Sequence, residues 1–378
     1  MAIQDIPQQA SERLPQTLDM LREIIHFESP SNEKIAVDRL VDYLEGQTKS
    51  RGAEVERLPQ ADYGDLLVAR WTGNGTEPLL IMTHIDTVWP IGTIGRLPWK
   101  IDDEVGRGPG IYDMKASIAM MLTAIDILQA TESIGRPITW LINTEEEVGS
   151  PISRPIIESL ARDSSTVLCL EPPVPPDDAL KTQRKGVGMF EMRVTGKAAH
   201  AGADHASGVS AIEELARQIQ WLHSLTDYDS GTTVNVGVIS GGTKRNVVAA
   251  EATALIDLRV ETMAEADRIV PIVQSAAPII DGASVRVEGE LNRPPMERSP
   301  HVVAAFEQAS EIAASIGQQV YESSTGGGSD GNFTAALGVP TIDGLGCPGD
   351  GAHAETEHIQ IPKIASRTAL IAALLSDL

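Results

Sequence analysis

A histidine and an aspartate, His84 and Asp86, directly follow the strand-like apolar run at 78–83. Such a run is typical of a strand buried on both faces. Side chains two residues apart on an extended chain point the same way, and open α/β folds place their chemistry at the carboxyl ends of strands. The pair could therefore be a metal-binding imidazole oriented by a carboxylate. The alternative is a histidine and a helix-capping aspartate in an ordinary turn.

Other segments deliver acidic residues in the same manner. A glycine-rich turn at 106–112 leads to Asp113 at the start of an apolar helix, and the apolar strands predicted at 137–142 and 166–170 each run into acidic residues. The strand-end groups that could share one site are His84, Asp86, Asp113, Glu145, Glu146, Glu147, Glu171 and, in the last loop, His353. Adjacent glutamates repel one another unless they share a cation or a proton. The alternatives are an N-cap for Asp113 and a solvated acidic loop for the glutamates.

Mixed imidazole and carboxylate ligands suit zinc, or a similar first-row ion, better than calcium or magnesium. Five ligands with one bridging carboxylate would make two metal sites about 3.5–4 Å apart, a geometry used for hydrolysis. Water bound there has a pKa of about 7 and still needs a general base beside it. Glu146 and Glu147 are therefore expected to have different roles, one as base and one as ligand.

The elements that must position these groups alternate between helix and strand, which predicts an α/β fold with a mixed, largely parallel sheet and helices on both faces. A proline-rich segment at 172–178 marks a boundary. Beyond it the pattern becomes β-α-β-β-α-β, an inserted split βαβ (ferredoxin-like) α+β domain. We expect a catalytic domain formed by residues 1–180 and 293–378 and an inserted domain at 181–292.

Composition restricts the partners. The chain has 378 residues with 53 acidic against 30 basic side chains, a net charge of −23. This balance argues against nucleic acid or an anionic membrane as partner, because both need a positive surface. No secretory signal is visible in the first twenty residues, so a cytoplasmic protein is expected, with a removed leader as the alternative.

The order and spacing of these motifs resemble the dizinc exopeptidase and deacylase family of glutamate carboxypeptidase, aminoacylase, acetylornithine deacetylase and succinyl-diaminopimelate desuccinylase. The matching segments are 83–88, 108–115, 144–150, 171–172, 196–202 and 351–353. The resemblance implies two zinc ions per chain, with cobalt or manganese as possible substitutes, bridged by Asp113. It assigns His84 and Glu171 to one ion and Glu147 and His353 to the other. Asp86 would orient His84, and Glu146 would be the base that shuttles a proton to the leaving amine.

The resemblance also covers substrate binding. His200 would support the oxyanion of the scissile carbonyl from the partner subunit of a homodimer formed through the inserted domain, and Asn246 would have a similar supporting role. Arg259 and Arg293 are placed like the arginines that bind the substrate carboxylate in glutamate carboxypeptidase; an arginine fork suits that group. The alternatives are a surface-loop histidine and surface ion-pair partners.

The implied activity, closest to that of glutamate carboxypeptidase, is release of a C-terminal glutamate or similar amino acid from N-acyl or peptidyl substrates. An N-acyl-amino-acid deacylase (aminoacylase-like or acetylornithine deacetylase-like) or a dipeptidase is the alternative. A serine hydrolase using Ser329, in the G-x-S-x-G match at 327–331, is a more distant one, because no buried strand is predicted before that serine. A non-catalytic binding protein on this scaffold would be expected to lack a ligand or the base, and every expected position is filled.

Overall fold

The computed structural model describes residues 3–73, 75–130 and 134–378. They form two compact units: the first runs to Gln183 and resumes as Arg298–Thr325 and Ser329–Leu378, and the second is Arg184–Glu297 with Gly326–Gly328. The second unit begins at Arg184, the last residue of strand β8 (Leu180–Arg184), which adds to the sheet of the first unit; the sequence analysis places this boundary at 181. The second unit ends at Glu297, beyond the last residue of strand β12, Arg293; the sequence analysis places this boundary at 292.

The first unit is built on an eight-stranded mixed sheet with the order β1-β2-β6-β3-β7-β14-β8-β13. Its central strands β6, β3, β7 and β14 are parallel, whereas β1, β2 and β8 pair antiparallel with their neighbours. The bounds are β1 (Glu54–Leu58), β2 (Leu66–Trp71), β3 (Leu79–His84), β6 (Ile138–Asn143), β7 (Thr166–Cys169), β13 (Glu322–Thr325) and β14 (Thr341–Asp343). This architecture confirms the predicted fold class.

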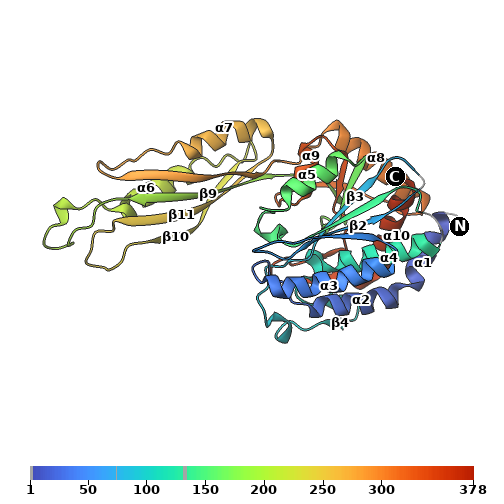
Figure 1. Ribbon diagram of the computed structural model, residues 1–378. Coiled ribbons are helices and arrows are strands. Elements are labelled where there is room, and N and C mark those ends of the chain that lie inside the picture. The colour runs from blue at the N-terminus through green and yellow to red at the C-terminus, as the bar shows by residue number, and fades with distance from the viewer. Residues whose placement is uncertain (1–2, 74, 131–133) are drawn as a thin grey trace. The chain divides into compact units, whose positions relative to one another are not determined.

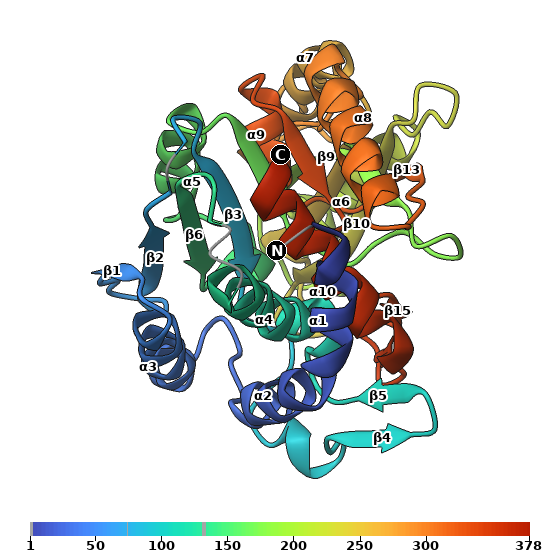
Figure 2. The same cartoon turned by 90° about the vertical axis from the view of Figure 1, so that its right-hand side faces the viewer.

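Helices cover both faces of that sheet (Figures 1 and 2). One face packs on α1 (Ile6–Glu12), α2 (Leu14–His26), α3 (Lys34–Ser50), α4 (Ala116–Ala130), α8 (Pro300–Ser315) and α10 (Ile361–Asp377). The other face packs on α5 (Arg154–Arg162) and α9 (Gly331–Ala336). Helix α4 is apolar all round and almost entirely buried, as a helix enclosed by its neighbours must be. Among the described residues, no helix combines the length and the apolar character needed to cross a bilayer.

A second, four-stranded sheet in this unit was not predicted from the sequence. Its order is β15-β16-β5-β4, with β4 (Lys100–Asp102), β5 (Val105–Arg107), β15 (Gly349–Asp350) and β16 (His358–Gln360). His358 pairs with Arg107, so the loop before Asp113 and the loop after His353 lie side by side. This small sheet brings together two site segments that are far apart in the sequence.

The second unit is an antiparallel sheet with the order β10-β11-β9-β12 and two helices. Along the chain it reads β9 (Gly186–Thr195), α6 (Ala211–His223), β10 (Thr233–Gly241), β11 (Glu251–Val260), α7 (Met263–Gln274) and β12 (Ser284–Arg293). This order confirms the predicted β-α-β-β-α-β pattern. The helices cover one sheet face, and the other face exposes Met189, Val238 and Leu255.

Asp65 holds the loop before β2 in place, and this loop contacts the segment that carries the glutamate run. Its carboxylate pairs with Lys34 at 2.6 Å and with Arg57 at 2.7 Å, and the carbonyl of Gly64 accepts a hydrogen bond of 2.6 Å from Thr144, next to the glutamate run. Burial alone would raise the pKa of Asp65, but Lys34, the backbone N–H of Gln60 and Arg57 lower it from 3.8 to about 2. Ionised Asp65 therefore stabilises the folded state above pH 3.8, and this contribution is lost as the pH falls toward 2.

We predict that Asp65→Asn lowers the free energy of unfolding at pH 7 by about 2 kcal/mol. Urea denaturation at pH 7 and at several lower values would show the difference from wild type narrowing as the pH falls below about 4. Asp42→Asn is the control, because Asp42 also pairs with Arg57 but its side chain is 65% exposed; a change within about 0.5 kcal/mol is expected there. An equal loss in both variants, or a difference independent of pH, would contradict the prediction.

Candidate metal centre

The candidate site lies at the carboxyl ends of three adjacent parallel strands of the first unit. His84 closes β3 and pairs in register with Asn143, the last residue of β6, and Glu171 lies two residues beyond β7. The glutamates Glu145, Glu146 and Glu147 follow β6. The apolar strands thus carry their polar ends to one edge of the sheet, where open α/β folds bind ligands.

The carboxylate of Asp113 lies between two imidazoles. Its Oδ1 is 3.0 Å from Nε2 of His84, and its Oδ2 is 3.3 Å from Nε2 of His353. Glu171 lies 3.6 Å from the same nitrogen of His84, and Glu147 lies 3.1 Å from that of His353. Each imidazole therefore has one oxygen of Asp113 and one glutamate beside it, and the structure brings together all five predicted metal ligands.

Two overlapping groups of side chains could each hold an ion. One group consists of His84, Asp113 and Glu147, and the other consists of His84, Glu146 and Glu171. The ligand atoms within each group lie within 4.8 Å of one another. The second group includes Glu146, to which the family resemblance assigns proton transfer rather than metal binding. Geometry alone permits either role for Glu146, and the two roles predict different phenotypes for its glutamine variant.

The field at this site is strongly negative. Burial opposes protonation of His84, but Asp113 and Asp86 raise its pKa well above 6.5. Hydrogen bonds to Asp113 and Glu147 raise the pKa of His353 to about 10. Burial acts to raise the pKa of Asp113, yet the two imidazoles hold it well below its usual range. A field that holds protons on both imidazoles also favours divalent cations.

Asp86 supports several groups at once. Nδ1 of His84 lies 3.0 Å from the backbone oxygen of Asp86 and 3.5 Å from its carboxylate. The carboxylate accepts the backbone N–H groups of Glu146 and Glu147, each at 3.1 Å, and the hydroxyl of Ser31 at 2.7 Å. Asp86 is fully buried, so this network fixes the start of the Glu146–Val148 turn relative to β3. The predicted role for Asp86 concerned His84 alone, and its contact with the glutamate run was missed.

The three adjacent glutamates have different surroundings. Glu145 is fully buried and accepts the backbone N–H groups of Ser153 at 2.7 Å and Ile152 at 3.1 Å, just before α5. Its side chain therefore anchors the start of a helix, whereas Glu146 and Glu147 belong to the two candidate metal groups. Three acidic residues in a row cannot all face one side of the chain, and the structure assigns the first of them to the helix.

His200 and Asn246 lie in the second unit, on neighbouring exposed loops. His200 forms a bridge with Val247, and the N–H of Ala201 donates to the carbonyl of Asn246 at 3.0 Å. Nδ1 of His200 accepts the backbone N–H groups of Ala203 at 2.9 Å and Gly202 at 3.2 Å. The neutral imidazole must then carry its proton on Nε2, which leaves that nitrogen as a donor. The predicted oxyanion role requires such a donor, and the role itself stays a prediction.

The two predicted substrate arginines also lie in the second unit. Nε and Nη2 of Arg259 each donate to the carboxylate of Asp257 at 2.9 Å, and Nη1 reaches the carbonyl of Gly326 at 3.4 Å. One N–H remains on each terminal nitrogen, so the outer edge of this fork can still meet a carboxylate. Arg293 follows a bulge at the end of β12 and is only 4% exposed.

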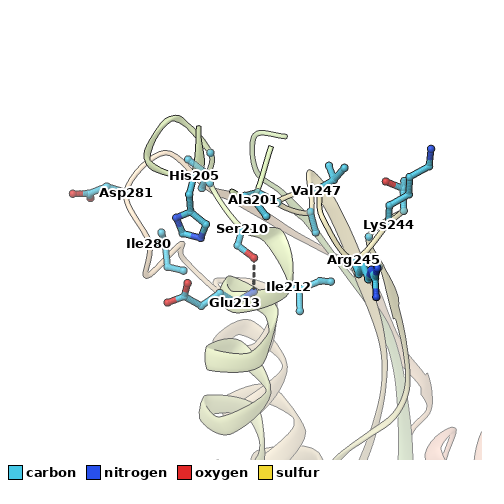
Figure 3. A pocket seen from close by; sticks show the side chains of 17 residues that line it. Ala201, His205, Ser210, Ile212, Glu213, Lys244, Arg245, Val247, Ile280 and Asp281 are labelled. Atoms are coloured by element: carbon cyan, nitrogen blue, oxygen red, sulfur yellow. Dashed lines mark hydrogen bonds between the residues drawn. The ribbon is translucent and has the colours of Figure 1, made fainter. Parts of the chain in front are cut away.

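A cavity of about 660 Å³ in the second unit adjoins the loops that carry His200 and Asn246. Figure 3 shows Lys244 and Arg245 on one side of it and Glu213 and Asp281 on the other. The N-terminus of α6 lies between them, where the hydroxyl of Ser210 accepts the N–H of Glu213 at 3.2 Å. The walls of this cavity therefore carry charges of both signs.

The serine-hydrolase alternative is wrong. Ser329 is fully buried, and its hydroxyl donates to Asp343 at 2.7 Å while accepting the N–H of Gly331 at 3.1 Å. A nucleophile needs access to substrate and a base within hydrogen-bond reach. His353, the histidine that alternative requires, instead contacts Asp113 and Glu147.

Comparison with known proteins agrees with this arrangement. A model of the family described as Peptidase family M20/M25/M40 matches residues 80–377. Carboxypeptidase G2 of Pseudomonas sp. (strain RS-16) is 29% identical over 382 aligned residues, which cover 98% of this chain and 91% of that protein.

Two solved structures share the fold. The Staphylococcus aureus subsp. aureus Mu50 tripeptidase SAV1512 gives a TM-score of 0.80 at 21% identity, over 96% of this chain and 98% of that one. The Bacillus subtilis YXEP protein, described as a dinuclear metal binding peptidase from the M20 family, gives 0.67 at 17% identity, over 97% and 98%. Because the family model matches well over half of the chain, including the insertion and the last loop, this chain belongs to peptidase family M20/M25/M40.

Proposed function

We propose that this protein is a zinc-dependent carboxypeptidase that releases a C-terminal glutamate or similar amino acid from N-acyl or peptidyl substrates. The observation that carries the proposal is the Asp113 carboxylate, which has an imidazole beside each oxygen and a glutamate beside each imidazole. Two imidazoles and several carboxylates are the donor set that zinc prefers. The overall likeness to carboxypeptidase G2 supports the choice of a carboxypeptidase.

The residues present fit a pair of zinc ions. His84 and Glu171 would hold one ion, Glu147 and His353 the other, and Asp113 would bridge them. Ions bound there would supply Lewis acidity toward the scissile carbonyl and lower the pKa of water. Glu146, half-buried beside His84 and Glu171, would take the proton from that water and pass it to the nitrogen of the leaving amine.

The second unit would complete the binding of substrate. His200, through its Nε2 donor, and Asn246 would support the oxyanion, and such a donor is worth about 3–4 kcal/mol of barrier. Arg259 and Arg293 would bind the carboxylates of the departing amino acid. We further propose that the second unit forms a homodimer interface, so that His200 would serve the site of the partner subunit.

A free terminal carboxylate should be required. We predict that an N-acyl-glutamate is hydrolysed at least tenfold faster, in kcat/KM, than the matching glutamate α-carboxamide, since a lost charged hydrogen bond costs about 1.5–3 kcal/mol. Arg259→Gln should lower kcat/KM for the acid and change it little for the amide. A panel ending in Glu, Asp, Ala, Leu or Arg would then identify the preferred residue.

Equal rates for acid and amide would overturn the carboxypeptidase assignment and leave the metal centre intact. A preference for another terminal residue would overturn the glutamate assignment alone. Activity that survives a chelator shown to strip the metal would contradict the proposed chemistry.

A further inference from the structure

Glu357 lies four residues after His353 and is 3% exposed. Its Oε1 accepts the backbone N–H groups of Tyr112 at 2.9 Å and Asp113 at 3.2 Å. Its Oε2 accepts the backbone N–H of Gly110 at 2.9 Å and the indole N–H of Trp89 at 2.8 Å. Four donors thus converge on one carboxylate, which matches the acceptor capacity of its two oxygens.

These four hydrogen bonds join three segments that carry candidate metal ligands. Trp89 lies just after His84, the last residue of β3. The three backbone donors belong to the loop that carries Asp113, and Glu357 lies at the end of the loop that carries His353. The pairing of β16 with β5 holds the last two segments side by side. One of the four donors is the backbone N–H of Asp113 itself.

We propose that Glu357 is a positioning residue for the metal centre, which sets the place of the Asp113 carboxylate relative to His84 and His353. This inference rests on the proposed dinuclear site. A bridging carboxylate must present one oxygen to each ion, so displacement of its backbone weakens both sites together. Groups that orient metal ligands from outside typically contribute about 10–100-fold to metal affinity or activity.

Glu357→Gln tests the proposal with little change of shape. Whichever way the amide turns, its nitrogen faces two N–H donors, so two hydrogen bonds are lost and donors oppose donors. Glu355→Gln is the matched control: it is the same change in the same loop, but the side chain of Glu355 is 70% exposed and pairs with Arg96 at the surface. Circular dichroism would first compare the folding of the metal-free forms.

The measurement is a titration of each metal-free protein with Co²⁺, followed by visible absorption. We expect wild type and Glu355→Gln to bind two ions with the same affinities and spectra. Glu357→Gln should bind both ions about 10–100-fold more weakly, with an altered spectrum. Trp89→Phe, which removes a single donor and keeps the carboxylate, should shift both affinities in the same direction by a smaller factor.

Two outcomes would overturn the inference. Wild-type affinities and spectrum in Glu357→Gln would show that Glu357 stabilises the loops without positioning the ligands. If Glu357→Gln does not fold, wild-type affinities and spectrum in Trp89→Phe would show the same. Failure of the wild-type protein to bind Co²⁺ would instead overturn the metal centre itself, and this inference with it.

Discussion

Glu146→Gln is expected to lower kcat by about 10²–10⁴-fold, the usual contribution of a general base, while the protein keeps both metal ions. Glutamine preserves the shape of the side chain and cannot accept the proton. The backbone N–H of Glu146 donates to Asp86 at 3.1 Å, so the main chain should hold its place in the variant. Metal content, kcat and KM measured on the same preparation give the result, and KM should change little.

The neighbouring glutamates are the controls for this experiment. Glu147→Gln should lose one metal ion, because Glu147 lies 3.1 Å from His353. Glu145→Gln should keep both ions and lose stability, because its carboxylate accepts the backbone N–H groups of Ile152 and Ser153. Loss of an ion from Glu146→Gln would contradict its role as base, since Glu146 also lies in a group that could hold an ion.

Asp113→Asn is expected to weaken both metal sites and to lower activity by about 10³-fold or more, since a bound ion supplies several kcal/mol of transition-state stabilisation. An amide keeps one acceptor oxygen and loses the negative charge that both ions would share. Isothermal titration of the metal-free protein with zinc would give the two affinities.

The bridging role predicts a specific contrast. Glu171→Gln and Glu147→Gln should each weaken a single site, whereas Asp113→Asn weakens two. Asp102→Asn is a suitable control, because Asp102 lies exposed on β4 and pairs with Lys100 at the surface. A fall in affinity at one site only in Asp113→Asn would contradict the bridge.

The convergence of His84, the glutamate run and Glu171 could be predicted because it depends on local pattern. Apolar runs that alternate with helices predict parallel strands, and the carboxyl ends of such strands meet at one edge of the sheet. The same pattern cannot show which of the adjacent glutamates faces the site and which anchors a helix. The distinct place of Glu145 depends on where α5 begins relative to the sheet, which is a tertiary contact.

Glu357 and the sheet that positions it could not be predicted for a related reason. Strands β4, β5, β15 and β16 have two or three residues each, too few to show a period. The pairing that joins the two halves of this sheet is long-range, because His358 of β16 pairs with Arg107 of β5. The only local signal was an acidic residue between Thr356 and His358 in a loop that already contains Glu355. Glu357 is buried whereas Glu355 is exposed, and this difference cannot be seen in the sequence.

Anomalous diffraction at the zinc absorption edge, from crystals of the zinc-loaded protein, tests the central claim most directly. The account predicts two peaks per chain about 3.5–4 Å apart, each about 2.0–2.2 Å from a different oxygen of Asp113. His84 and Glu171 should flank one peak, and Glu147 and His353 the other. A single peak, or two peaks without Asp113 between them, in protein whose activity zinc restores would contradict it.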